Sequence, residues 1–68
     1  MSYKIETDRE DDGRWIAEVP AIPGAMAYGL TEQEAIAKAE AIALRVLADR
    51  IEANKKPAAK ITVSFTCA

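Results

Sequence analysis

The sequence has 68 residues, of which 50% are hydrophobic and 29% are charged, and its formal net charge at pH 7 is −2. This length suffices for one domain, and the balance is that of a globular chain rather than a disordered one. The chain has no histidine and one cysteine, Cys67. Imidazole–metal sites, Ser–His or Cys–His catalysis and an internal disulfide are therefore excluded. The slightly acidic charge argues against a nucleic-acid-binding surface.

Neither kind of apolar segment that directs a protein to a membrane is visible. Residues 1–6 become charged at once, unlike a signal peptide. No apolar run approaches the roughly 20 residues that a membrane-spanning helix needs. We therefore expect a single cytoplasmic domain, residues 1–68, without membrane association.

A β-hairpin is predicted at the start of the chain. Residues 3–7 alternate in polarity, which is typical of a half-buried strand. Residues 10–13 end in Asp-Gly, a strong signal for a hairpin turn, and residues 14–19 alternate again as the returning strand. The side chains expected to face the core from these two strands are Tyr3, Ile5, Thr7, Trp15, Ala17 and Val19.

Two prolines then interrupt the pairing of backbone groups. Because Pro20 and Pro23 lack the amide hydrogen that a central strand donates, residues 20–24 are predicted to form a bend or a bulge. Residues 25–28 are short and apolar, and Gly29 follows them. This pattern favours a third strand that ends at the glycine.

The clearest local signal is the start of a long helix. Thr31 and Glu34 have the spacing of a capping box, in which the Thr31 hydroxyl accepts from the Glu34 amide and the Glu34 carboxylate accepts from the Thr31 amide. Helix-forming residues continue to about Ala53. Asn54 suits a left-handed C-cap, and Pro57 stops the helix.

One stripe of this helix is apolar and the opposite side is charged, so the helix is predicted to cover one face of a sheet. The stripe is wider than one sheet face requires because Leu44, Leu47 and Ile51 extend it. Their i, i+3, i+7 spacing is typical of a seam against a second helix, and so short a chain gains from self-association. We predict an oligomer interface at these residues; the alternative is that they wrap around the edge of the sheet.

A final strand is predicted at residues 60–66, where Ile61, Val63 and Phe65 point one way. The order of elements is therefore β-β-β-α-β. We expect an α+β fold in which one long helix packs on one face of a small, mainly antiparallel sheet. Polar side chains on the other face are expected to meet water.

Two groups of acidic residues are candidates for metal sites. Residues 8–13 begin like a calcium loop, but Glu10 is too long for the third ligand position and the last ligand position holds valine, so a solvated turn is predicted. Glu6, Asp8 and Glu18 could meet on adjacent strands and hold Mg²⁺ for phosphoryl chemistry. A carboxylate that faces a basic side chain across strands is the more common arrangement. We predict no metal, no cofactor and no catalytic residue.

The order of short motifs along the chain resembles that of the HicB-like antitoxins. The motifs are an acidic-Gly-Arg-Trp-Ile-Ala run that ends at Ala17, then Val19-Pro20-x-Ile22-Pro23-Gly24, then Gly29-x-Thr31-x-x-Glu34-Ala35. The similarity extends from about Tyr3 through the long helix to the closing strand. It implies the β-β-β-α-β arrangement of the family's N-terminal domain, a partial RNase H-like fold.

The resemblance also implies a function. Many such proteins neutralise HicA, a small toxin that cleaves mRNA, by covering its active site in a type II toxin–antitoxin pair, and many carry a C-terminal DNA-binding domain. This chain ends at Ala68, so we expect no direct DNA binding. Ala21 and Leu30 stand where acidic residues are common in the family, and Ala25 stands where cysteine is common.

The main functional hypothesis is a non-enzymatic module that sequesters a small basic HicA-like toxin, to which an acidic protein is steered electrostatically. The predicted contact residues lie in the acidic turn and the proline bend: Glu10, Asp11, Asp12, Ile22 and Pro23. One alternative is a stand-alone HicB-like homodimer with a regulatory role. The other is a residual Mg²⁺-dependent ribonuclease that uses the three strand carboxylates.

Overall fold

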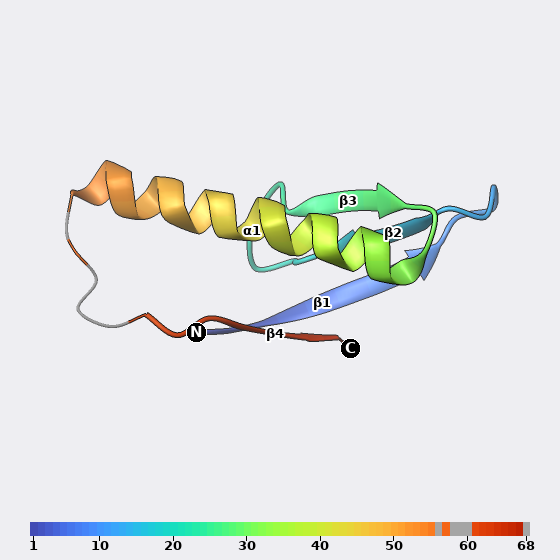
Figure 1. Cartoon of the computed structure of the whole chain (residues 1–68), viewed down its shortest axis with the longest axis horizontal. Coiled ribbons are helices and arrows are strands. Elements are labelled where there is room, and N and C mark those ends of the chain that lie inside the picture. The colour runs from blue at the N-terminus through green and yellow to red at the C-terminus, as the bar shows by residue number, and fades with distance from the viewer. Residues whose placement is uncertain (56, 58–60, 68) are drawn as a thin grey trace.

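Three strands, one long helix and a fourth strand follow one another along the chain (Figure 1). The computed structural model describes residues 1–55, 57 and 61–67. The elements are β1 (Ser2–Arg9), β2 (Trp15–Glu18), β3 (Met26–Gly29), α1 (Glu32–Asn54) and β4 (Ser64–Cys67). The predicted α+β class and the β-β-β-α-β order are confirmed.

The four strands form one sheet in the order β3-β2-β1-β4. The β1–β2 and β2–β3 pairs are antiparallel, whereas β4 runs parallel to β1. A parallel pair needs a long crossover connection, and α1 supplies it. The sheet is thus mixed: β1, β2 and β3, from the first half of the chain, form the two antiparallel pairs, and β4 adds the parallel pair.

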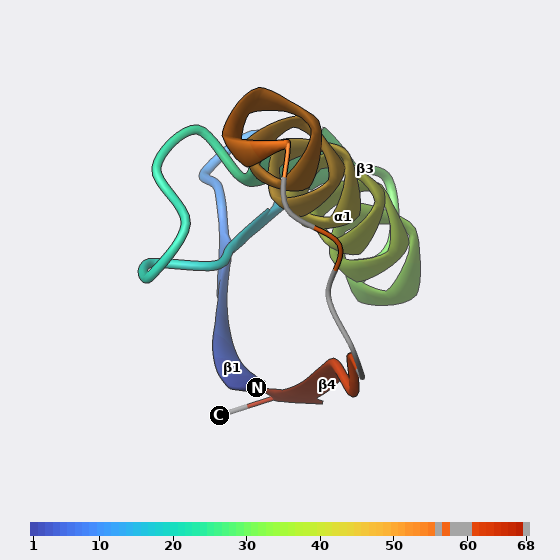
Figure 2. The same ribbon diagram turned by 90° about the vertical axis from the view of Figure 1, so that its left-hand side faces the viewer.

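The core lies between α1 and the inner face of β2 and β3. Every fourth residue of the first half of the helix is a buried alanine, namely Ala35, Ala39 and Ala43. Such small side chains let the helix approach the sheet closely. Viewed along the long axis, β3 lies beside α1 while β4 lies at the far edge (Figure 2). The other buried side chains come from β1, β2 and the bend: Ile5, Ala17, Val19, Ile22 and Ala25.

The two ends of α1 differ in part from the predicted caps. The Thr31 hydroxyl accepts from the Glu34 amide at 3.1 Å, as expected. The Glu34 carboxylate instead binds Lys38 Nζ at 2.9 Å, so the second bond of the capping box is replaced by an ion pair one turn along the helix. At the other end Asn54 is the last helical residue, and Lys55 is the left-handed cap with a φ of 53°. The steric effect of Pro57 reaches only the residue directly before it, so it does not prevent the helix from ending at Asn54, one residue later than predicted.

The closing strand begins later than predicted. Residues 61–63 are irregular, β4 starts at Ser64, and Lys60 lies outside the described residues. Ser2, the first residue of β1, pairs with Ser64. Before it, Met1 accepts from the Ser64 amide at 2.9 Å and its ammonium group donates to the Thr62 carbonyl at 2.6 Å. Phe65 is half-buried and lies against Tyr3, with ring centroids 6.0 Å apart.

Candidate functional site

The face of the sheet opposite α1, here called the outer face, combines acidic and apolar side chains. Cross-strand partners point to the same side of a sheet, and the register pairs Glu6 with Glu18 and Asp8 with Ile16. The next pairs along, between β2 and β3, are Glu18–Met26 and Ile16–Tyr28. The outer face therefore carries two adjacent rows that both run from carboxylate to apolar side chain. On β1, β2 and β3 the charged and large apolar residues of the outer face are Lys4, Glu6, Asp8, Ile16, Glu18, Met26 and Tyr28.

The three carboxylates of the outer face have no ion-pair partner within the part of the chain that the structure describes. The ion pairs there are Arg14–Asp12 and Lys38–Glu34. Glu6 lies directly opposite Glu18, and like charges in that position destabilise a sheet. Because both carboxylates lie on an exposed face, an external cationic group can approach them and relieve this repulsion.

The outer-face carboxylates border a shallow hollow of about 270 Å³, lined by Glu6, Thr7, Asp8, Ile16 and Glu18. Within the described ranges, no three acidic, cysteine or histidine side chains are arranged so that they could hold a metal ion. Carboxylates beside an apolar side chain instead form a surface that suits a protein partner with basic side chains.

The acidic turn is built around one carboxylate. Asp12 accepts from the backbone amide of Arg14 at 3.0 Å and from its Nε at 2.7 Å. These two bonds, the amide bond first, hold the pKa of Asp12 below its usual value. The Arg14 guanidinium also lies 4.5 Å from the centroid of the Tyr28 ring, at the border of the outer face. Asp12 thus shapes the turn, and Asp11 remains exposed at its tip.

The proline bend requires one correction to the predicted contact residues. Ile22 is 1% exposed and belongs to the core, so its side chain is not available to a partner. The cause is a backbone fold-back in which the Ile22 amide donates to the Val19 carbonyl and the Val19 amide donates to the Ala25 carbonyl, both at 2.9 Å. Pro23 is exposed and lines a hollow of about 330 Å³ beside the bend.

The structure does not bring the two predicted contact elements together. The acidic turn precedes β2 and the bend follows it, so they lie at opposite ends of this strand (Figure 1). The outer face lies between them. From the sequence its three carboxylates were candidates for a metal site only, because strands that alternate like any half-solvated sheet do not indicate a protein contact. Ile16, an apolar residue between Arg14 and Glu18 on the polar face, was the available signal.

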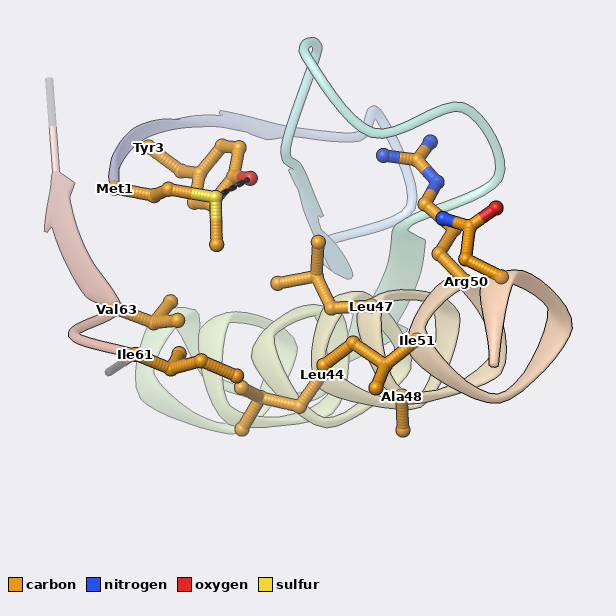
Figure 3. Close-up of a pocket in the computed structure, with 10 residues that line it drawn as sticks. Met1, Tyr3, Leu44, Leu47, Ala48, Arg50, Ile51, Ile61 and Val63 are labelled. Atoms are coloured by element: carbon orange, nitrogen blue, oxygen red, sulfur yellow. Dashed lines mark hydrogen bonds between the residues drawn. The ribbon is translucent and has the colours of Figure 1, made fainter. Parts of the chain in front are cut away.

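The predicted oligomer residues line a groove of about 380 Å³ beneath the second half of α1 (Figure 3). Leu44 is 49% exposed and Ile51 is 38% exposed. Leu47 is half-buried and packs partly against the core. The alternative was that Leu44, Leu47 and Ile51 all wrap around the edge of the sheet. Only Leu47 packs in this way. Met1, Ile61 and Val63 form the opposite wall.

Comparison of the chain with protein-family models, with curated proteins and with solved structures found no match. Among the described residues, no helix combines the length and the apolar character that a membrane span requires.

Proposed function

We propose that this protein is a non-enzymatic binding module of the cytoplasm that sequesters a small basic protein. In keeping with the motifs shared with the HicB-like antitoxins, the proposed partner is a HicA-like toxin that cleaves mRNA. The proposed contact surface is the outer face of the sheet. Its single strongest support is the set of three outer-face carboxylates that have no ion-pair partner among the described residues.

Charge complementarity is the physical basis of the proposal. A toxin that grips RNA needs basic side chains to contact phosphates. Glu6, Asp8 and Glu18 present three acceptors on one exposed face. A basic side chain placed between Glu6 and Glu18 exchanges a repulsion for two attractions. Opposite charges of this kind also raise the association rate, an effect that weakens as salt increases.

Exposed apolar side chains supply the second component of the surface. Met26 and Tyr28 are exposed beside the carboxylates, although both are large and hydrophobic. Tyrosine and methionine are enriched at protein interfaces because they bury much area on contact. Because the outer-face carboxylates lie next to the exposed Met26 and Tyr28, this surface suits a folded basic protein better than a free ion.

The proposal is tested by expressing the chain together with a HicA-like toxin in bacteria. We expect the wild-type chain to restore growth that the toxin arrests. The outer-face variant Glu6→Gln/Glu18→Gln should lose this protection, because it removes two of the three carboxylates. The matched control Glu10→Gln/Asp11→Asn changes the charge by the same amount in the acidic turn.

Each outcome of this comparison has a distinct meaning. Retained protection by the control together with loss in the outer-face variant supports the outer face. The reverse pattern overturns it in favour of the turn. No protection by the wild-type chain, when circular dichroism shows it folded, overturns the antitoxin role itself.

A further inference from the structure

The second half of α1 extends beyond the sheet that supports the first half. The helix has 23 residues, which corresponds to roughly 34 Å at 1.5 Å per residue. Its buried residues end at Ala43, so residues 44–54 contain no fully buried side chain. Figure 1 shows this part of the helix projecting past the strands. The apolar side chains there consequently lack the cover that the alanines of the first half have.

These side chains form one wall of an open apolar groove. Leu44, Leu47 and Ile51 approach from the helix, and Ile61 and Val63 from the chain before β4 (Figure 3). Met1, which is 62% exposed, lies in the same groove. So many exposed large hydrophobic side chains in one place mark an interaction site.

We propose that a second copy of this chain covers the groove, with residues 44–54 of the two α1 helices packed antiparallel about a two-fold axis. An axis midway between residues 47 and 48 sets Leu44 of one copy opposite Ile51 of the other, and Leu47 opposite Ala48. Such an arrangement is isologous, because the same patch supplies both sides of the contact. The i, i+3, i+7 spacing of the three apolar residues is the spacing that a helix–helix seam requires.

The charges beside this seam identify the occupant as a second copy. In the same register Glu40 of one helix lies opposite Lys55 of the other. Arg45 and Glu52 are seven residues apart and so share one flank of the helix. The two-fold axis brings Arg45 of one copy to within about 3 Å, along the helix axis, of Glu52 of the other, since they are two residues out of register. None of these four side chains has an ion-pair partner within residues 1–55, 57 and 61–67.

The inferred dimer does not depend on the proposed function. The groove lies on the helix side of the sheet, whereas the outer face lies on the other side. A dimer formed through the groove leaves both outer faces free. Failure of one proposal therefore leaves the other standing.

The test is analytical ultracentrifugation of the full chain over about 1 to 500 µM, a range that detects dimers of moderate affinity. We expect the wild-type chain to dimerise. Leu44→Glu should raise the dissociation constant by at least about tenfold, since it places a charge in the seam twice per dimer. Leu30→Glu is the matched control, because Leu30 is 77% exposed and lies outside the groove. It should leave the constant unchanged.

A charge exchange tests the antiparallel register itself. Arg45→Glu and Glu52→Arg should each weaken the dimer by about fivefold to thirtyfold, because each replaces two attractions by two repulsions. The double variant Arg45→Glu/Glu52→Arg should restore the wild-type constant. A wild-type chain that stays monomeric throughout overturns the dimer. A dimer that the double variant does not restore overturns this pairing of helices.

Discussion

Neutralising one member of the Glu6–Glu18 pair should stabilise the free protein. The two residues are direct cross-strand partners, so their Cβ atoms lie roughly 4.5–5.5 Å apart. Two carboxylates about 6 Å apart in water repel each other by about 0.7 kcal/mol. A Debye length of about 10 Å at 0.1 M salt reduces this to about 0.4 kcal/mol. Glu18→Gln should therefore raise the free energy of unfolding by about 0.5 kcal/mol at low salt.

Urea unfolding followed by the fluorescence of Trp15 measures this difference, most precisely as a shift of the midpoint. A double-mutant cycle isolates the interaction: once Glu18 is neutral, Glu6→Gln should add nothing further. The gain should vanish near 1 M salt, where the Debye length is about 3 Å. Lys4→Gln, on the same strand and face, should not stabilise. A gain that persists at high salt, or no gain at low salt, would refute the repulsion inferred here.

Three further predictions concern the turn and the core. Gly29→Ala should destabilise the fold by about 1–3 kcal/mol, because the new Cβ would lie 2.5 Å from the Ala35 backbone nitrogen; thermal unfolding measures the loss, and an unchanged midpoint contradicts the close approach. Ile22→Ala should lower the free energy of unfolding in urea by about 2–5 kcal/mol, since Ile22 is fully buried. A loss below about 1 kcal/mol would contradict this burial. Asp12 should titrate below 3.8 by NMR, and Arg14→Ala should restore only part of the shift because the amide bond remains. Since the folded pKa is the lower one, the stability that Asp12 contributes is present at neutral pH and is lost as the pH falls through that pKa.

The elements of this fold follow from local patterns, and the errors arise where distant parts of the chain meet. Alternation correctly assigned the inward faces of β1 and β2, including the buried Ile5 and Ala17. Ile22 was misjudged because a Pro-x-x-Pro segment has the local pattern of a surface bend, whereas its side chain belongs to the buried cluster that also contains Ile5 of β1 and Ala39 of α1. The start of β4 depends on where β1 begins, and nothing near Ser64 in the sequence encodes that.

The candidate site shows the same division. The carboxylates of Glu6 and Glu18 could be assigned to the polar face from the sequence, but not to opposite positions. Their opposition depends on the register of the hairpin, which the turn geometry at Asp12 and Gly13 determines. The exposure of Leu44 and Ile51 was better predicted, because these residues exceed what one sheet face needs and this excess is visible in the helical periodicity itself.

Titration calorimetry of the chain with a HicA-like toxin tests the central claim most directly. We predict a complex whose dissociation constant rises at least about tenfold in Glu6→Gln/Glu18→Gln and rises again with added salt, because two carboxylates and their attraction to basic side chains are lost. Absence of binding by the wild-type chain, or equal affinity of the outer-face variant, would contradict it.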